Sequence, residues 1–238
     1  MKSYIITIEF ADLSPSVWRK VIMPAGATFK RLHEVIQHTT NFQEEHLYEF
    51  DLSQSENIVV TNDDHAYREH KNYLKNKKIF EKNLENIPDE FKEFEQRRMK
   101  RIQIPVRKPQ TLKIDAYLEK HNELPYLYDY GDHWLLTVTL DEIVDDYYFG
   151  YPTLLDGEGQ APPENVGGIP WYEHFLKAYE DETHPDHKQM REWTEGFAYR
   201  PYDPSHINLI LKHVHYQKTE WNKIHHKNYI VIEDKYVK

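Results

Sequence analysis

Residues 3–24, SYIITIEFADLSPSVWRKVIMP, decide the fold that this sequence predicts. From Tyr4 to Phe10, large apolar side chains occupy every second position, which is the period of a β-strand with one buried face. A turn at residues 14–16 leads to a second strand over Val17–Met23. The opening of the chain therefore predicts two strands joined by a turn, and it does not have the pattern of a signal peptide.

The segments that follow these two strands predict a helix and further strands. In residues 28–40 the apolar side chains recur with the period of a helix, and Thr28 is a suitable N-cap. Residues 46–52 alternate as a third strand. Residues 111–118 also alternate as a strand, and residues 124–144 predict two strands around a turn.

The C-terminal third predicts helices over residues 170–181, 184–195 and 203–217, each with a proline at or near its first turn. A short strand or tail is expected at about 219–238. Together these elements predict an α+β fold in a single domain over residues 1–238. Its sheet would be mixed and mostly antiparallel, with helices on its faces.

A charged helical insertion is predicted at about residues 62–108. This segment contains 13 Lys/Arg and 9 Asp/Glu, a net charge of +4, whereas the rest of the chain carries −14. Residues 97–108 hold six basic residues and no acid. They are candidates for contacts with a nucleic-acid backbone, or they are a solvated helix end. The six are Arg97, Arg98, Lys100, Arg101, Arg107 and Lys108.

The overall composition argues against several classes of protein function. A net charge of −10 argues against a dedicated duplex-DNA binder, because phosphate neutralisation needs an excess of basic residues. The absence of cysteine removes thiolate metal sites and Cys nucleophiles, and it fits a cytoplasmic protein. No apolar run is long enough to span a membrane. His213, His215, His225 and His226 lack the spacing of a metal motif and are expected to lie in a solvated tail.

The glycine-rich stretch 154–175, LLDGEGQAPPENVGGIPWYEHF, is the least ordinary part of the chain. Five of the eight glycines lie between residues 150 and 168. Glycine is needed where the backbone adopts positive φ or passes close to another group. One interpretation is purely structural, with a turn at 157–159 and with Gly167-Gly168 allowing the backbone to pack under Trp171. The alternatives are a pocket for a ligand or partner, and a metal site.

A second candidate site is YLYDYGDHW, residues 126–134. Its acids could cap backbone N–H groups in a hairpin turn over residues 130–132, or they could bind a metal or act in acid–base chemistry. A divalent-metal hydrolase would combine the carboxylates and histidine of both stretches. Its ligands would be Asp129, Asp132, His133, Asp156, Glu158 and Glu164.

Four segments resemble the Ri-plasmid ORF-three-like domain family: VWRKVIMPAGATFKRLHEVIQ, HLYEF, YLYDYGDHW and LLDGEGQAPPENVGGIPWYEHF. The resemblance covers residues 3–52 and about 111–218. It implies an α+β fold in a plasmid or mobile-element context, and some members are labelled resolvase-like. It does not imply a biochemical activity. The matching positions are Trp18, Arg19, Leu32, His33, His46, Leu47, Phe50, Asp129, Gly131, Asp132, Trp134, Gly157, Pro162, Pro163, Glu164, Gly167, Gly168 and Tyr172.

Two positions depart from the family pattern. Asn165 replaces a usual aspartate, and Leu136 replaces a frequent histidine. The loss of a carboxylate and an imidazole, together with the absence of a recognisable nucleophile motif, argues against an enzyme. We therefore expect a non-catalytic domain without cofactor or metal that binds a protein or peptide. The first alternative is a nucleic-acid-associated protein that uses the basic insertion, and the second is the metal hydrolase. The candidate binding surface comprises Trp18, Arg19, His33, His46, Asp129, Asp132, Trp134, Glu158, Glu164, Gly167, Gly168, Trp171 and Tyr172.

Overall fold

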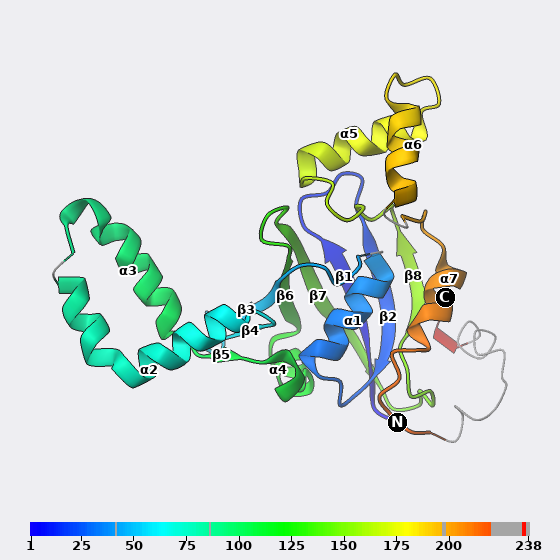
Figure 1. The fold of residues 1–238 in the computed structure, drawn as a ribbon. Helices are drawn as coiled ribbons and strands as arrows, with labels where there is room; N and C mark the ends of the chain where they lie inside the picture. Colours follow the sequence, from blue (N-terminus) through cyan, green and yellow to red (C-terminus); the bar gives the residue numbers. More distant parts are fainter. Residues whose placement is uncertain (41, 86, 197–198, 220–234, 237–238) are drawn as a thin grey trace.

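A long, twisted sheet organises the molecule in the computed structural model, which describes residues 1–238 except 41, 86, 197–198, 220–234 and 237–238 (Figure 1). Within the described residues, eight strands follow the order β5-β4-β3-β6-β7-β1-β2-β8. Every neighbouring pair is antiparallel except β4 and β5. The strands are β1 Ser3–Phe10, β2 Trp18–Pro24, β3 Tyr48–Leu52, β4 Ile58–Thr61, β5 Val106–Arg107, β6 Glu123–Tyr128, β7 Trp134–Val144 and β8 Thr153–Glu158. The expected α+β class with a mixed, mostly antiparallel sheet is confirmed.

The predicted opening hairpin lies inside the sheet, between β7 and β8. β1 pairs with β2 in a register that places Ser3 opposite Pro24 and Glu9 opposite Trp18. On its other side β1 pairs with β7, the second strand of the predicted 124–144 hairpin. The sequence pattern at the start of the chain therefore defines two interior strands, with β7 added beside β1 and β8 added beside β2.

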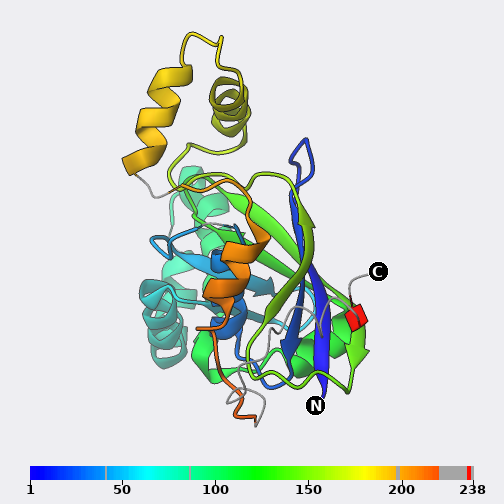
Figure 2. The same cartoon turned by 90° about the vertical axis from the view of Figure 1, so that its right-hand side faces the viewer.

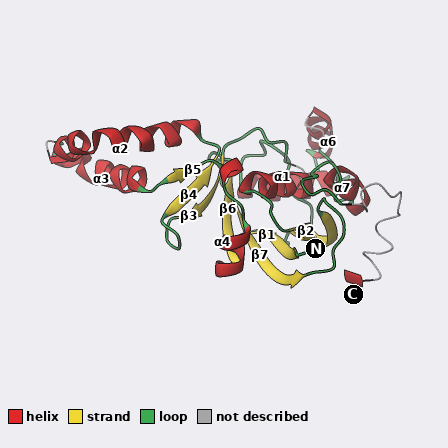
Figure 3. Cartoon of the chain, turned by 90° about the horizontal axis from the view of Figure 1, so that it is seen from below, coloured by secondary structure: helices red, strands yellow, loops and turns green. Residues whose placement is uncertain are grey.

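Helices cover one face of β1 and β2. α1 (Phe29–Thr40) and α7 (Pro204–Leu211) lie on the same side of the sheet (Figure 3). α1 packs its buried Leu32 and Ile36 into the main hydrophobic core. The opposite face of β1 and β2 is covered by a second apolar cluster from the β7–β8 connection, including Tyr147 and Phe149. Both faces of β1 and β2 thus carry apolar clusters.

Three sequence predictions are wrong. The strand predicted at 111–118 is instead a short 3-10 helix, η1 (Pro109–Thr111), followed by α4 (Asp115–His121). Ile114 and Leu118 are both fully buried, and their four-residue spacing is that of one helix face. The helix predicted over 203–217 ends at Leu211. The C-terminal strand expected at 219–238 falls almost wholly outside the described residues.

Part of the predicted glycine-rich loop is a strand, which is the third error. β8 pairs antiparallel with β2, and Leu154 and Leu155 are both buried, so the segment shows no alternation of apolar and polar residues. α7 lies alongside β8 and covers its free edge (Figure 2). The Asn208 side chain accepts a hydrogen bond from the N–H of Leu154 and donates one to its carbonyl, as a neighbouring strand would. β4, at residues 58–61, is a strand that the sequence analysis did not predict.

The insertion is helical, as predicted, and forms a hairpin that projects far from the sheet (Figure 1). We call it the arm; it consists of α2 (Asp64–Glu85) and α3 (Asp89–Gln103). Tyr73, Met99 and Ile102 form a small apolar cluster of its own. The arm leaves the sheet after β4 and returns into β5.

Two further helices, α5 (Ile169–Glu180) and α6 (His187–Gly196), form a hairpin at one end of the sheet (Figure 2). Both were predicted within a few residues of their observed bounds. None of the helices in the described parts of the chain combines the length and apolar character that crossing a membrane requires.

Candidate functional site

The glycine-rich segment and the 129–133 turn meet at the base of α5. Asp132 Oδ2 accepts a hydrogen bond of 2.9 Å from the backbone N–H of Gly167. A Cβ on Gly168, whose φ is 80°, would lie 3.1 Å from the carbonyl oxygen of Asp132. A Cβ on Gly167 would lie 2.9 Å from the Trp171 ring, so the predicted passage of the backbone under Trp171 holds for Gly167, whereas Gly168 faces the backbone of Asp132. The two glycines are therefore required by close approach.

The turn itself is built as the structural interpretation predicted. Asp129 adopts a φ of 56°, and its Oδ1 accepts a hydrogen bond of 2.8 Å from the N–H of Gly131. The N–H of His133 donates to the carbonyl of Asp129 at 2.7 Å. Both acids of this turn thus accept backbone N–H groups, Asp129 within the turn and Asp132 across to the glycine loop.

A polar cluster joins this turn to the loop before β3. Three oxygen atoms surround Nε2 of His46: Oδ1 of Asn165 at 3.0 Å, Oε1 of Glu164 at 3.4 Å and Oδ2 of Asp129 at 3.5 Å. Because all three neighbouring atoms are hydrogen-bond acceptors, Nε2 of His46 carries a hydrogen and donates a hydrogen bond to Asn165. With the family's usual aspartate at position 165, His46 would face three carboxylates instead of two.

Glu164 is the most buried member of this cluster, with 2% of its surface exposed. Its carboxylate accepts hydrogen bonds of 2.8 Å from the N–H of Gln43 and from the hydroxyl of Tyr128. Burial raises the pKa of the Glu164 carboxyl above its ordinary value, although both hydrogen bonds act to lower it. The cluster therefore connects three distant segments through its own internal hydrogen bonds.

Arg19 is buried and holds β8 to the end of α1. Its guanidinium donates to the carbonyl oxygens of Thr39 at 2.9 Å, Trp18 at 2.7 Å, Glu158 at 2.6 Å and Gly159 at 2.9 Å. The Tyr202 ring stacks on it at 4.1 Å. Burial lowers the pKa of Arg19 to about 10, but the side chain stays charged at neutral pH.

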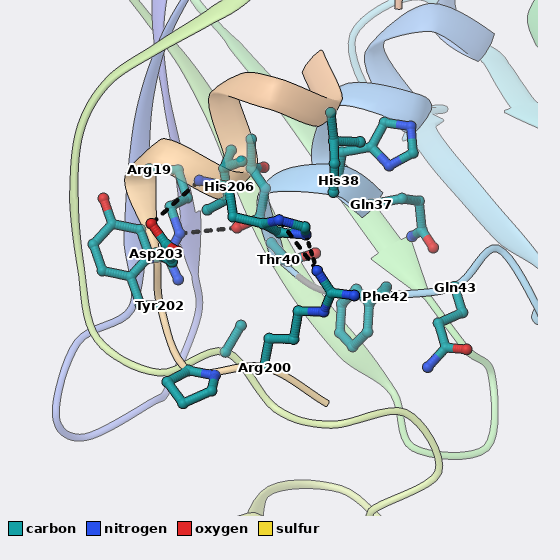
Figure 4. A pocket seen from close by; sticks show the side chains of 15 residues that line it. Arg19, Gln37, His38, Thr40, Phe42, Gln43, Arg200, Tyr202, Asp203 and His206 are labelled. Carbon is teal, nitrogen blue, oxygen red and sulfur yellow. Dashed lines mark hydrogen bonds between the residues drawn. The ribbon is translucent and has the colours of Figure 1, made fainter. Parts of the chain in front are cut away.

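Arg19 also lines a cavity of about 300 Å³ between α1 and α7, across which Arg200 reaches toward the ring of His206 (Figure 4). Asp203, on the same wall, caps α7 by accepting from the N–H groups of Ser205 and His206. Arg19 and Asp203 therefore bond to the backbone, and Arg200 bonds to His206.

His33 lies in the core on the other side of the polar cluster. Its ring stacks on Tyr48 at 3.6 Å, and its Nδ1 lies 2.8 Å from the Tyr126 hydroxyl. Burial lowers the pKa of His33 to about 3, so the imidazole is neutral and shares a hydrogen bond with the Tyr126 hydroxyl. His33 is a structural residue of the core.

Burial corrects the predicted binding surface. Arg19, His33, Trp134, Glu164 and Tyr172 are buried, each at most 3% exposed. They were predicted at the surface because polar and aromatic signature residues are typical of contact sites. In the structure they bond or pack internally. Of the predicted residues, Trp171 is the large exposed one, with 62% of its surface accessible.

Trp171 borders a surface pocket of about 460 Å³ between the glycine loop and the α5–α6 hairpin, which we call the aromatic pocket. Val166, Phe175, Met190 and Trp193 supply most of its remaining apolar wall. The contribution of α6 to this pocket was not predicted from the sequence. The detectable signal was Met190 and Trp193, two apolar residues three positions apart on a helix that is otherwise polar.

The metal-hydrolase alternative loses its ligand set. Among the described residues, which include all six predicted ligands, no three of the six bring ligand atoms within 4.8 Å of one another. Asp156 and Glu158 lie on β8, away from the turn, because that segment is a strand. His213 and His215 follow the end of α7, and His225 and His226 lie outside the described residues.

The basic segment 97–108, which runs from α3 of the arm past β5, is largely paired with acids. Four of the six predicted nucleic-acid contacts form ion pairs: Arg97 with Glu93, Arg98 with Glu69 and Glu95, Arg101 with Glu49 and Asp51, and Lys108 with Asp64. Lys100 and Arg107 are exposed. This pairing reduces the positive charge that the segment presents to a phosphate backbone.

The sequence profile described as "Plasmid pRiA4b ORF-3-like protein" matches residues 2–210, which include the turn, the glycine loop and the arm. The chain belongs to the plasmid pRiA4b ORF-3-like family. It is 27% identical over 196 residues to the uncharacterized protein y4hQ of Sinorhizobium fredii, a match that covers 82% of this chain and 81% of that protein. The family fold is similar to the crystal structure of MM3350, a protein of unknown function from Methanosarcina mazei Go1. That similarity has a TM-score of 0.60 at 22% identity and covers 86% of this chain and 96% of the other.

Proposed function

We propose that this member of the plasmid pRiA4b ORF-3-like family is a non-catalytic domain that binds a protein or peptide. The aromatic pocket is the observation that carries the proposal. It is a concave site of about 460 Å³ with an exposed tryptophan at its rim, and tryptophan is among the residue types that contribute most at protein interfaces.

The polar signature residues support this function indirectly. The His46–Glu164–Asp129 cluster and the bond from Gly167 to Asp132 fix the loop that leads into α5, the helix that carries Trp171. A binding domain needs such a rigid support, because a preorganised site loses less entropy when its partner binds. The signature residues in this proposal act as the scaffold for the pocket.

The composition of the pocket indicates the kind of partner. Its walls are mainly aromatic and aliphatic, and Asn165, Asp186 and Gln189 add polar groups. A volume of this size suits one or two large apolar side chains. We therefore propose that the partner presents an apolar anchor residue, flanked by groups that can form hydrogen bonds to the rim.

Selection of random peptides displayed on phage would test this function. The expected result is enrichment of peptides that share an apolar anchor. Fluorescence anisotropy should then show that Trp171→Ala weakens binding at least tenfold, which corresponds to about 1.4 kcal/mol. Phe94→Ala is the matched control, because Phe94 is an equally exposed aromatic residue on the arm. Failure to enrich any peptide, or an equal effect of the two substitutions, would contradict the proposal.

A further inference from the structure

Two histidines and an aspartate converge at the α5–α6 hairpin, at residues that the sequence analysis did not select. His174 lies on α5, and His184 and Asp186 lie in the connection to α6. One nitrogen of each histidine and one carboxylate oxygen of Asp186 all lie within 4.8 Å of one another. Imidazole and carboxylate are ligands that bind Zn²⁺ and related divalent transition-metal ions.

We infer that His174, His184 and Asp186 form a binding site for a divalent transition-metal ion of the Zn²⁺ class. The inference stands independently of peptide binding, because it rests on these three side chains alone. Three protein ligands leave at least one coordination position for water or an incoming group, which is the arrangement of an open zinc site.

The distances fit a metal ion after small side-chain movements. Nε2 of His174 is 3.3 Å from Oδ2 of Asp186, and Nδ1 of His184 is 4.0 Å from the same oxygen. Ligand atoms around a tetrahedral zinc ion, with bonds of about 2.0–2.2 Å, lie roughly 3.3–3.5 Å apart. The first pair already has this separation, and the second requires a shift of less than about 1 Å.

The imidazole of His184 offers an unprotonated nitrogen to the cluster. Nδ1 of His184 accepts a hydrogen bond of 3.1 Å from the backbone N–H of Asp186, and an ion bound by Nδ1 would take the place of this hydrogen bond. The rings of His174 and His184 meet edge to face at 5.6 Å, which directs them to a common region instead of stacking them. All three side chains are half-buried, so an ion can reach them from solvent.

The backbone around the site is well fixed. Asp181 Oδ1 accepts from both the N–H and the hydroxyl of Thr183. The N–H of His184 donates to the carbonyl of Asp181 at 2.9 Å. Nδ1 of His187 lies 2.9 Å from the carbonyl of Ala178, which ties the start of α6 to the end of α5. A metal site formed by this connection would therefore be largely preformed.

The site opens on the aromatic pocket, because His174 and Asp186 also line that pocket. The remaining coordination position would thus be available to a group that enters the pocket. Carboxylates and imidazoles are the classes of group that could complete the coordination.

Zinc binding to the tag-free full chain tests the inference. Titration with Zn²⁺ in competition with a chromophoric chelator should show one ion retained per chain. His174→Ala and Asp186→Asn should each weaken this binding at least tenfold. His65→Ala is the matched control: the chain has fifteen histidines, and His65 is an exposed one on α2. It should leave the affinity unchanged.

One further measurement separates a metal site from a simple His–Asp ion pair. Bound Co²⁺ should give the visible absorption of a low-coordinate site in the wild type and lose it in His174→Ala. Retention of no ion by the wild type would overturn the inference, as would equal affinity in wild type and His174→Ala. Unchanged affinity in Asp186→Asn would overturn the assignment of the carboxylate.

Discussion

Replacing Arg19 by methionine removes a buried charge together with the four hydrogen bonds that it donates to backbone carbonyls. Each hydrogen bond from a charged donor contributes about 1.5–3 kcal/mol. Against this stands the cost of burying the guanidinium. The lowering of its pKa from 12.5 to about 10 corresponds to roughly 3 kcal/mol. Four bonds outweigh that cost, even when water in the adjacent cavity replaces some of them.

We therefore expect Arg19→Met to lower the free energy of unfolding by about 3–5 kcal/mol. Urea denaturation followed by far-UV circular dichroism would measure the change. Arg200→Met is the matched control, because Arg200 lines the same cavity but is exposed. Its effect should stay within about 0.5 kcal/mol. If Arg19→Met lowers the free energy of unfolding by less than about 1 kcal/mol, the cost of burying the charge nearly cancels the gain from its hydrogen bonds. That result would refute the assignment of Arg19 as the link between β8 and α1.

Three other expectations follow from the site. Burial raises the pKa of Glu164, so its contribution to stability is largest at low pH and declines as pH rises through the folded-state pKa. The stability cost of Glu164→Gln in urea titrations should therefore be smaller at pH 7 than at pH 4, and a cost that grows with pH would contradict this sign. The pKa of His33 is lowered to about 3, so its contribution is present above the ordinary value near 6.5 and is lost as pH falls. The acid-induced loss of stability between pH 6.5 and pH 4 should be smaller in His33→Phe than in wild type, and identical pH profiles would argue against a buried neutral imidazole. Gly167→Ala should cost about 1–3 kcal/mol and change tryptophan fluorescence, because φ is 96° and the new Cβ meets the Trp171 ring; Gly196→Ala, with open space around its Cβ, is the control, and equal thermal shifts in the two variants would oppose the close-contact argument.

Elements with a single clear period were predictable from the sequence. The alternation from Tyr4 to Phe10 predicts a strand, and the three- and four-residue spacing after Thr28 predicts α1. The strand predicted over residues 111–118 was wrong because a segment of eight residues can fit both the period of a helix and that of a strand. Ile114 and Leu118 fit a helix as well as a strand. β8 was not predicted because its sequence shows no strand period. Leu154 and Leu155 are buried on both faces, so no alternation marks the strand.

The local geometry of the candidate site could be predicted from the sequence, but the burial of its side chains could not. The turn at Asp129 and the role of Gly167 follow from local chemistry, which the sequence contains. The burial of Arg19 does not, because it depends on carbonyl groups of Thr39 and Gly159 that lie far away in the sequence. The pocket wall from α6 was missed since it requires knowing that α6 folds back against α5.

The connection between β4 and β5 has a consequence for the evolution of this fold. The two strands are parallel neighbours, with Val59 opposite Val106, so a tight turn cannot join them. A crossover of about a dozen residues would be enough, yet the chain makes an excursion of two long helices stabilised by a separate small core. The parallel pairing of β4 and β5 therefore sets a minimum length for the connection between them but no maximum length. Its length can diverge between relatives, and the reach of the arm can change, without disturbing the strands that carry the glycine loop and its pocket.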